Sequence, residues 1–233
     1  MRLMIIDTAL GLCTAGVFKA GVFEAGDGDV RRLGLRSESM VKGHSERIAG
    51  FARDAAAEAG VGFNTLDRIG VTIGPGSFTG LRVGLAFAKG LAAALDRPVV
   101  GISTLDALAA SAREAPAVAA LIDARRGQVY ARFWRGGAAE GPAEALTLEA
   151  AAARIAGLEA GGVLVGSGAA LFADLATGLS LFPLDGPAPE ALARLAAAAD
   201  PARAPAAPLY LRAPDATPPT RLPGQARVTA TAP

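Results

Sequence analysis

LMIID, residues 3–7, is an apolar run that ends in an aspartate and is followed by Gly11 and a second apolar run. ALID, residues 120–123, repeats the pattern, with Gly127 at the same distance from its aspartate and another apolar run after it. Each copy predicts a strand, a turn and a second strand. A repeated supersecondary unit indicates a duplicated architecture, so the sequence predicts two related lobes, the second beginning near residue 117.

Between the two copies, predicted strands alternate with predicted helices in the order β-β-β-α-β-α-β-α. This order is typical of an α/β fold in which helices cover a mixed sheet. The spacing of apolar residues predicts long helices at His44–Ala59 and Thr79–Leu95. We expect a first lobe at residues 1–115, a second lobe at residues 116–212, and a proline-rich, disordered tail at residues 213–233.

Charge and cysteine content restrict the class of protein. The 23 basic and 22 acidic residues give a net charge of +1, which is too balanced for a chain that binds nucleic acid by itself. Cys13 is the single cysteine, so no internal disulfide can form and a reducing compartment is expected. Asp7 interrupts the N-terminal apolar run, and the apolar stretch from Val83 to Leu95 contains Lys89 and is too short for a bilayer. These features predict a soluble cytoplasmic protein without a membrane segment.

The most distinctive local sequence is GPGSFTGLR, residues 74–82, between a predicted strand and a predicted helix. Glycines and an exposed helix start suit an anion such as phosphate, but neither a P-loop nor a dinucleotide fingerprint is present. The favoured interpretation is a structural turn that leads into a tightly packed helix, with an anion-binding turn as the alternative. The residues concerned are Gly74, Gly76, Ser77, Thr79 and Gly80.

The helix that follows is apolar around nearly its whole circumference, since its only charges are Arg82 and Lys89. Such a helix is usually buried on more than one side. A stripe of small residues four apart, from Gly80 to Ala92, would allow another backbone to come close. Either both faces belong to this chain's core or one face meets another subunit, and the sequence leaves both open.

His44 is the only histidine, which excludes any metal site that needs two histidines. The chain also lacks the Gly-x-Ser-x-Gly elbow of a serine hydrolase. A capping or interface role is favoured for His44, with Ser45 as the candidate helix cap. We therefore expect no catalytic residue, no metal and no cofactor in this chain.

These blocks, taken together and in this order, resemble the TsaB family, also called YeaZ, from Met1 to about Arg212. GPGSFTG is the most specific of them. The blocks that carry the resemblance are Ile5–Thr8, His44–Glu46, Gly74–Gly84, Ser103–Leu105, Ile122–Arg126 and Tyr210–Arg212.

The resemblance implies an actin-like, sugar-kinase-like (ribonuclease H-like) two-lobe fold with mixed sheets and a reduced second lobe. In that superfamily, paired hairpins grip nucleotide phosphates, so Asp7, Thr8 and Asp123 become candidates for a vestigial nucleotide site. The bulky, basic turn at Arg125 and Arg126 favours the alternative, in which Asp123 merely stabilises its own turn.

The resemblance also implies a non-catalytic subunit that pairs with a TsaD-like catalytic paralogue, joined by a TsaE-like ATPase, to place threonylcarbamoyl on an adenosine beside the tRNA anticodon. It implies tRNA contact only through the complex, and a homodimer when the chain is alone. The two first-lobe helices would form the partner interface. The expected contacts are His44, Arg47, Ile48, Phe51, Ala55, Arg82, Leu85, Ala88 and Ala92. An aspartate at Ala88 would then abolish pairing and leave the fold intact.

Two rival functions come from other classes of protein. One is an autonomous enzyme, either an actin-like ATPase that uses Asp7 and Asp123 or a glycoprotease-like peptidase. The other is a stand-alone RNA-binding module that uses the arginines between Arg125 and Arg135. The lone histidine argues against the first, and the balanced charge against the second.

Overall fold

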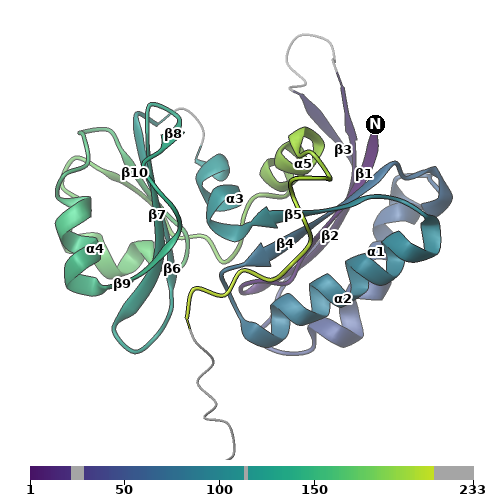
Figure 1. The fold of residues 1–233 in the computed structure, drawn as a ribbon, viewed down its shortest axis with the longest axis horizontal. Helices are drawn as coiled ribbons and strands as arrows, with labels where there is room; N and C mark the ends of the chain where they lie inside the picture. Colours follow the sequence, from purple (N-terminus) through teal and green to yellow (C-terminus); the bar gives the residue numbers. More distant parts are fainter. Residues whose placement is uncertain (22–28, 113–114, 213–233) are drawn as a thin grey trace, which may run out of the picture.

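The structure, a computed structural model, describes residues 1–21, 29–112 and 115–212, which form two α/β lobes side by side (Figure 1). The first lobe is built on a five-stranded sheet in the order β3-β2-β1-β4-β5. Strands β1, β2 and β3 are antiparallel neighbours, whereas β4 and β5 run parallel to β1, so the sheet is mixed as predicted. Its strands are β1 (Arg2–Asp7), β2 (Leu12–Ala20), β3 (Val30–Ser39), β4 (Arg68–Gly74) and β5 (Val99–Ser103).

The second lobe repeats the hairpin that opens the first. In the first hairpin Asp7 lies opposite Thr14, and in the second Asp123 lies opposite Val129. Both aspartates end their strand, which confirms the repeat predicted from the sequence. The strands of this lobe are β6 (Ala117–Asp123), β7 (Gln128–Arg135), β8 (Ala138–Ala139), β9 (Glu144–Thr147), β10 (Val163–Val165) and β11 (Ser180–Phe182).

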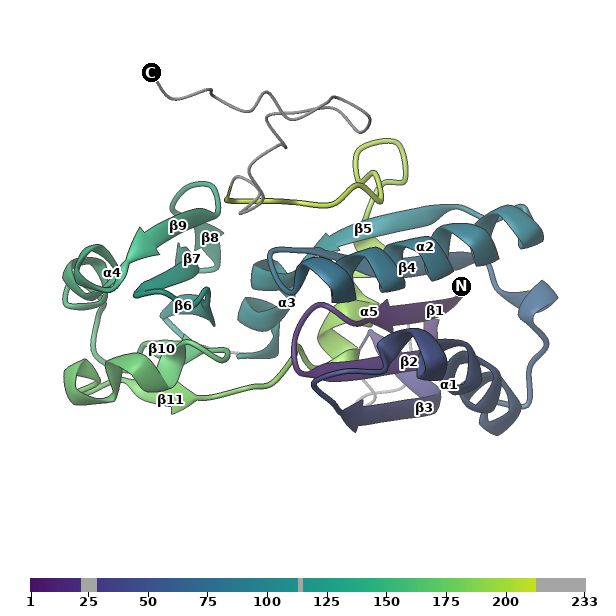
Figure 2. The same ribbon diagram turned by 90° about the horizontal axis from the view of Figure 1, so that it is seen from below.

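Two helices cover each face of the first sheet (Figures 1 and 2). On one face, α1 (His44–Glu58) and α2 (Phe78–Leu95) enclose a core with the side chains of Met4 and Ile6. On the other, α3 (Thr104–Ser111) and α5 (Pro189–Ala198) pack on the alternate residues Leu3 and Ile5. This alternation follows from the two-residue period of a strand.

The second sheet is covered by α4 (Leu148–Ile155) and the short helix η2 (Ala169–Leu175), which enclose Leu121 and Phe133. Its other face packs on α3, where Leu105 and Leu108 meet Val118 and Val165. Helix α3 therefore lies between the two sheets and joins the lobes. A further short helix, η1 (Phe63–Thr65), precedes β4.

Strand β6 begins at Ala117, next to the predicted lobe boundary, but the C-terminal part of the expected second lobe packs on the first lobe. Helix α5 contacts β1, β4 and β5 of the first sheet, and the chain after it continues along the first lobe. The assignment of all of residues 116–212 to the second lobe is thus wrong for α5 and the segment that follows it. The predicted tail at residues 213–233 lies outside the described residues.

The predicted start of the first long helix is confirmed, its predicted cap is wrong, and the second long helix starts one residue earlier than predicted. Helix α1 begins at His44 itself, after Gly43 in a left-handed conformation (φ 92°), so Ser45 does not cap it. Helix α2 begins at Phe78, where the Ser77 hydroxyl accepts a hydrogen bond from the Gly80 amide. A serine at this position is a favoured helix cap.

Candidate functional site

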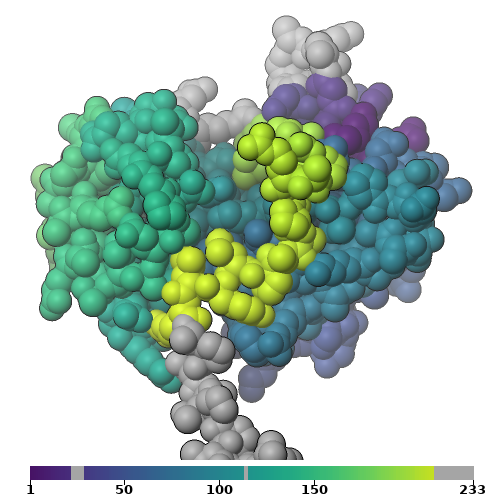
Figure 3. All heavy atoms as spheres, viewed as in Figure 1, coloured from purple at the N-terminus to yellow at the C-terminus, as the bar shows by residue number. Residues whose placement is uncertain are grey.

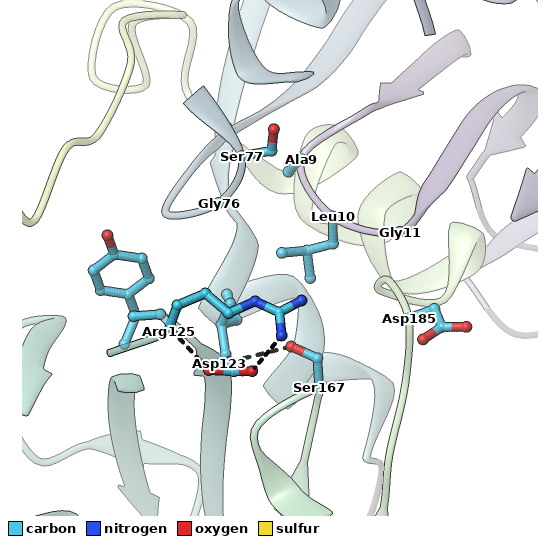
Figure 4. A pocket seen from close by; sticks show the side chains of 12 residues that line it. Ala9, Leu10, Gly11, Gly76, Ser77, Asp123, Arg125, Ser167 and Asp185 are labelled. Atoms are coloured by element: carbon cyan, nitrogen blue, oxygen red, sulfur yellow. Dashed lines mark hydrogen bonds and ion pairs between the residues drawn. The ribbon is translucent and has the colours of Figure 1, made fainter. Parts of the chain in front are cut away.

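A cleft of about 470 Å³ lies between the lobes, at the ends of the two aspartate-bearing strands. Figure 4 shows its walls, formed by the two hairpin turns and by the loop that leads into α2. The lining residues are Ala9, Leu10, Gly11, Gly76, Ser77, Ile122, Asp123, Ala124, Arg125, Tyr130, Ser167 and Asp185. The cleft lies between the two hairpins that the family resemblance marked as candidates for a vestigial nucleotide site.

Asp123 lines the cleft, but its own turn engages its carboxylate. The amide of Arg125 donates to Asp123 Oδ1 at 2.8 Å, and the Arg125 guanidinium lies 3.3 Å from Oδ2. Figure 4 shows the arginine side chain over the aspartate. Arg125 and Arg126 both have positive φ, 61° and 53°, a conformation that bulky residues rarely adopt. The carboxylate thus stabilises a strained turn, which agrees with the alternative interpretation of this hairpin.

Asp7 does not reach the cleft at all. Its side chain is fully buried, and its Oδ1 accepts hydrogen bonds from the Ala9 amide at 3.0 Å and the Thr72 hydroxyl at 2.7 Å. Oδ2 has no hydrogen-bond partner among the described residues. Burial raises the pKa of Asp7 above its ordinary value. Thr8 is buried as well, and its hydroxyl donates to the Gly80 carbonyl at 2.7 Å. Of the three nucleotide-site candidates, only Asp123 faces the cleft.

The loop that contains GPGSFTG packs against the first hairpin. The Ser77 amide donates to the Ala9 carbonyl at 2.8 Å. A Cβ on Gly76 would lie 2.3 Å from the Ala9 carbonyl oxygen, and a Cβ on Gly80 would lie 2.1 Å from that of Thr8. These glycines are therefore required for backbone-to-backbone contact inside the lobe. Such internal contacts account for Gly76 and Gly80 without an anion and support the structural-turn interpretation.

Replacing Asp7 with asparagine should stabilise the chain at neutral pH, because a neutral amide costs less to bury than a carboxylate. Asparagine retains an oxygen for the Ala9 amide and the Thr72 hydroxyl but carries no charge. Since the folded-state pKa of Asp7 is raised, the folded chain binds more protons than the unfolded chain between the ordinary aspartate pKa, about 3.9, and the raised value. Wild-type stability should fall as pH rises through that window, and the Asp7→Asn variant should lack this part of the pH dependence.

Thermal unfolding of both chains from pH 4 upward measures this difference. Asp185→Asn, at an exposed position on the cleft rim, is the matched control and should change little. A variant no more stable than the wild type at neutral pH would show that Asp7 is charged and well solvated in the folded chain.

No group of three or more histidine, cysteine, aspartate and glutamate side chains that could hold a metal occurs in the part of the chain that the structure describes. His44 is buried at the start of α1, outside the cleft lining. The arginines after the second hairpin do not form one basic surface. Arg132 lies 2.6 Å from Asp106, and Arg135 bonds to two glutamates at 2.8 and 2.7 Å.

The second candidate site is the outer surface of α1 and α2, the side turned away from the sheet. Its members are small or apolar for the most part, and they are exposed apart from Gly50, Val83 and Phe87, which are half-buried. We call this surface the outer α1–α2 face; it comprises Ala49, Gly50, Arg53, Ala57, Thr79, Val83, Ala86, Phe87, Gly90 and Ala93. Glycines 50 and 90 each stand in open space, because a methyl group added at either position would have no described atom within 4 Å.

Helix α2 is long and apolar enough to cross a membrane by length and composition, and it is the one such helix among the described residues. The apolar stretch from Val83 to Leu95 was predicted to be too short to cross a bilayer. The helix that contains it already begins at Phe78, so this prediction does not hold for the length of the whole helix. Here the helix forms a layer on the first sheet, with Leu81 and Leu85 buried beneath it.

The structure places most of the predicted interface residues beneath the outer α1–α2 face instead of on it. The following side chains are buried in this chain's own core: Ile48, Phe51, Ala55, Leu85, Ala88 and Ala92. Ala88 is fully buried, so an aspartate there would place a charge in the core and unfold the lobe. The expectation that Ala88→Asp spares the fold is therefore wrong. Arg47 and Arg82 are exposed beside the face, while His44 is buried.

Four α2 residues of the outer α1–α2 face were not among the predicted interface residues. Val83, Ala86, Phe87 and Gly90 recur at intervals of three, one and three residues, which is one side of a helix. Ala86 and Gly90 are exposed, whereas Val83 and Phe87 are half-buried against the first-lobe core. The stripe from Gly80 to Ala92 recurs in the same way on the opposite side, where it touches the first hairpin and the sheet. Periodicity alone cannot tell which of two apolar sides meets the sheet.

Comparisons with known proteins find similarity to proteins named TsaB and to the TsaD family model. The family model described as "TsaD: tRNA N6-adenosine threonylcarbamoyltransferase" matches residues 32–152. The chain is 34% identical over 133 residues to the Escherichia coli "tRNA threonylcarbamoyladenosine biosynthesis protein TsaB", a match that covers 56% of this chain and 53% of that protein. Against the first curated relatives the match thus spans about half of their length.

Other relatives match over nearly their whole length. An uncharacterized protein of Mycobacterium bovis is 36% identical over 92% of this chain and 93% of its own. The solved structure titled "YeaZ from Pseudomonas aeruginosa" superposes with a TM-score of 0.70 at 30% identity, covering 90% of this chain and 99% of that one. The predicted actin-like α/β fold is confirmed by this match and by the sheet topology.

Proposed function

The chain belongs to the TsaB (YeaZ) family, and from this premise we propose that it is the non-catalytic scaffold of a complex that makes threonylcarbamoyladenosine in tRNA. Its partner is a TsaD-type catalytic subunit, and a TsaE-type ATPase joins the pair. The observation that carries the proposal is the outer α1–α2 face, a largely apolar surface. The cleft of the same chain has no phosphate loop, and the carboxylate of Asp123, which lines it, is engaged by its own turn.

Two glycines in the middle of helices support pairing through this face. A glycine inside a helix is about 1 kcal/mol less favourable than alanine. Within this chain, no packing contact requires glycine at position 50 or 90. A partner backbone that comes close over these positions supplies such a reason. Small residues on a helix surface permit close approach of a second helix.

The family match supports a TsaD-type protein as the partner. The TsaD family model matches residues 32–152, a range that includes both α1 and α2. A TsaD-type chain therefore has counterparts of these helices, and the two related surfaces can meet about a pseudo-twofold axis. The same geometry explains a homodimer when the partner is missing.

Charged side chains border the apolar face and give it a polar rim. Arg47 pairs with Glu38 at 2.8 Å and lies over the Phe51 ring. Arg82 stacks on the Phe78 ring at 3.7 Å. A rim of this kind around an apolar centre is usual for protein interfaces.

The test is reconstitution of tRNA modification from purified components. Transfer RNA, ATP, the threonylcarbamoyl-adenylate supply, the TsaD-type and TsaE-type proteins should give threonylcarbamoyladenosine only when this chain is added. Full modification without the chain would refute the proposal. ATP hydrolysis or peptide cleavage by the chain alone would favour an autonomous enzyme, and salt-sensitive tRNA binding by the chain alone would favour an RNA-binding module.

A further inference from the structure

A segment after α5 runs from the first lobe back to the second and joins the two lobes a third time. We call residues 204–212 the strap. Figure 3 shows it as the yellow band that runs from the first lobe toward the second. The chain crosses between the lobes after α3 and again before α5, so the strap is a third crossing.

The strap is fitted closely onto the first lobe. The Gly101 amide donates to the Ala204 carbonyl at 3.0 Å, and the Leu209 amide donates to the Ile73 carbonyl at 2.7 Å. A Cβ on Gly101 would lie 2.5 Å from the Pro205 carbonyl oxygen, and a Cβ on Gly74 would lie 2.7 Å from that of Leu209. Two strands of the sheet thus carry glycine where the strap passes, because only glycine leaves room for its backbone.

The strap also contacts the start of α2. The Tyr210 ring lies 5.5 Å from the Phe78 ring, centroid to centroid, and its hydroxyl accepts a hydrogen bond from Arg82 at 3.4 Å. These contacts connect the strap to the end of the helix that borders the cleft.

Arg212 attaches the strap to the second lobe. Its guanidinium donates to the Ala124 carbonyl at 3.2 Å and to the Gln128 side-chain oxygen, and it lies 5.9 Å from the Tyr130 ring. Ala124 and Gln128 flank the strained turn of Arg125 and Arg126. The strap therefore connects α2 to the turn that forms the opposite wall of the cleft.

We propose that the strap locks the angle between the lobes, so that the cleft stays at one width instead of opening and closing. Besides the strap, the lobes are joined by α3, by Leu10 of the first hairpin, which packs against the second-lobe cluster, and by a hydrogen bond from the Gly11 amide to the Asp185 carbonyl at 2.9 Å. Relative movement is the default for two lobes joined on one side only. With the strap in place, the lobes are held from both sides. This lock is a property of the isolated chain and does not depend on the proposed partner.

The test is the distance between spin labels on the two lobes, measured by double electron–electron resonance on the full chain. Cysteines replace Ala57 on α1 and Ala153 on α4, which are both exposed. The native Cys13 is buried, and burial raises the pKa of its thiol to about 11, so it stays unlabelled. Dilution with unlabelled chain removes distances between two copies.

Two variants release the strap, one from the first lobe and one from the second. Leu209→Pro removes the amide that donates to Ile73, with Leu209→Ala as the matched control that keeps it. Arg212→Ala removes the contacts to the second lobe, with Arg203→Ala, an exposed arginine just before the strap, as its control.

The distance distribution should be narrow in the wild type and the controls, and about twofold broader in both release variants, as expected when two lobes regain relative motion. A distribution unchanged by Arg212→Ala and Leu209→Pro would overturn the proposal. Circular dichroism establishes that each variant is folded. Should Leu209→Pro fail to fold, Arg212→Ala decides, because its side chain lies at the surface end of the strap.

Discussion

A chain with glutamate in place of Gly90 is expected to fold normally and to bind a TsaD-type subunit at least about 100-fold more weakly, a loss of roughly 2.7 kcal/mol. Gly90 is exposed in the middle of the outer α1–α2 face, and a side chain there meets open space in the free chain. Glutamate is also a better helix former than glycine. At the interface, however, its side chain would hold the partner away and bury an unpaired charge.

Isothermal titration calorimetry with the TsaD-type protein of the same organism measures the effect. Ala153→Glu introduces the same charge on an exposed helix position of the second lobe and should bind like the wild type. Gly50→Glu, on the neighbouring helix, should repeat the loss. If Gly90→Glu and Gly50→Glu bind as tightly as the wild type, pairing uses another surface.

A single methyl group on Gly80 is expected to destabilise the chain by about 3 kcal/mol, the upper end of the usual cost of overpacking. The added Cβ would lie 2.1 Å from the Thr8 carbonyl oxygen, so the backbone of either α2 or the first hairpin must move. The same substitution at Gly90, ten residues further along the helix, meets open space. There alanine should stabilise the chain by about 1 kcal/mol through its higher helix propensity.

Urea unfolding of Gly80→Ala and Gly90→Ala against the wild type gives both changes from one experiment. The opposite signs follow from the packing of the two sides of α2. If Gly80→Ala were as stable as the wild type and instead lost affinity for phosphate or nucleotide, GPGSFTG would be a ligand site and not a packing motif.

The fold could be predicted from the sequence because its decisive pattern is short and local. An apolar run, an aspartate and a glycine four residues later occur twice, and each copy forms the predicted hairpin at β1–β2 and β6–β7. The alternation of strands and helices in the first lobe was equally readable, because each element is long enough to show its period. Only the helix ends moved, by one or two residues.

Which side of helix α2 is buried could not be predicted with the same success. Helix α2 is apolar on both sides, so its sequence does not state which side meets the sheet. The stripe at Gly84 and Ala88 proved to face inward, and Ala86 and Gly90 outward. The chosen interface residues were therefore mostly core residues, although the choice of the two helices still stands as a prediction.

The positions of α5 and of the segment after it in the tertiary structure could not be predicted from the sequence either. Helix α5 is an alanine-rich amphipathic helix, and an apolar stripe on such a helix fits either sheet equally well. The stretch from Pro208 to Arg212 docks on the lobes without forming a strand. It is held instead by one backbone hydrogen bond from Leu209 and by the side chains of Tyr210 and Arg212. Contacts of this kind depend on the tertiary structure and leave no periodic signal.

The most direct test of the scaffold proposal is size-exclusion chromatography with light scattering, on this chain alone and mixed with the TsaD-type protein of its organism. The mixture should elute as a single species whose mass is the sum of one copy of each chain, and Gly90→Glu should restore two separate species. Separate elution of the unmodified chains, with and without ATP, would contradict the scaffold proposal.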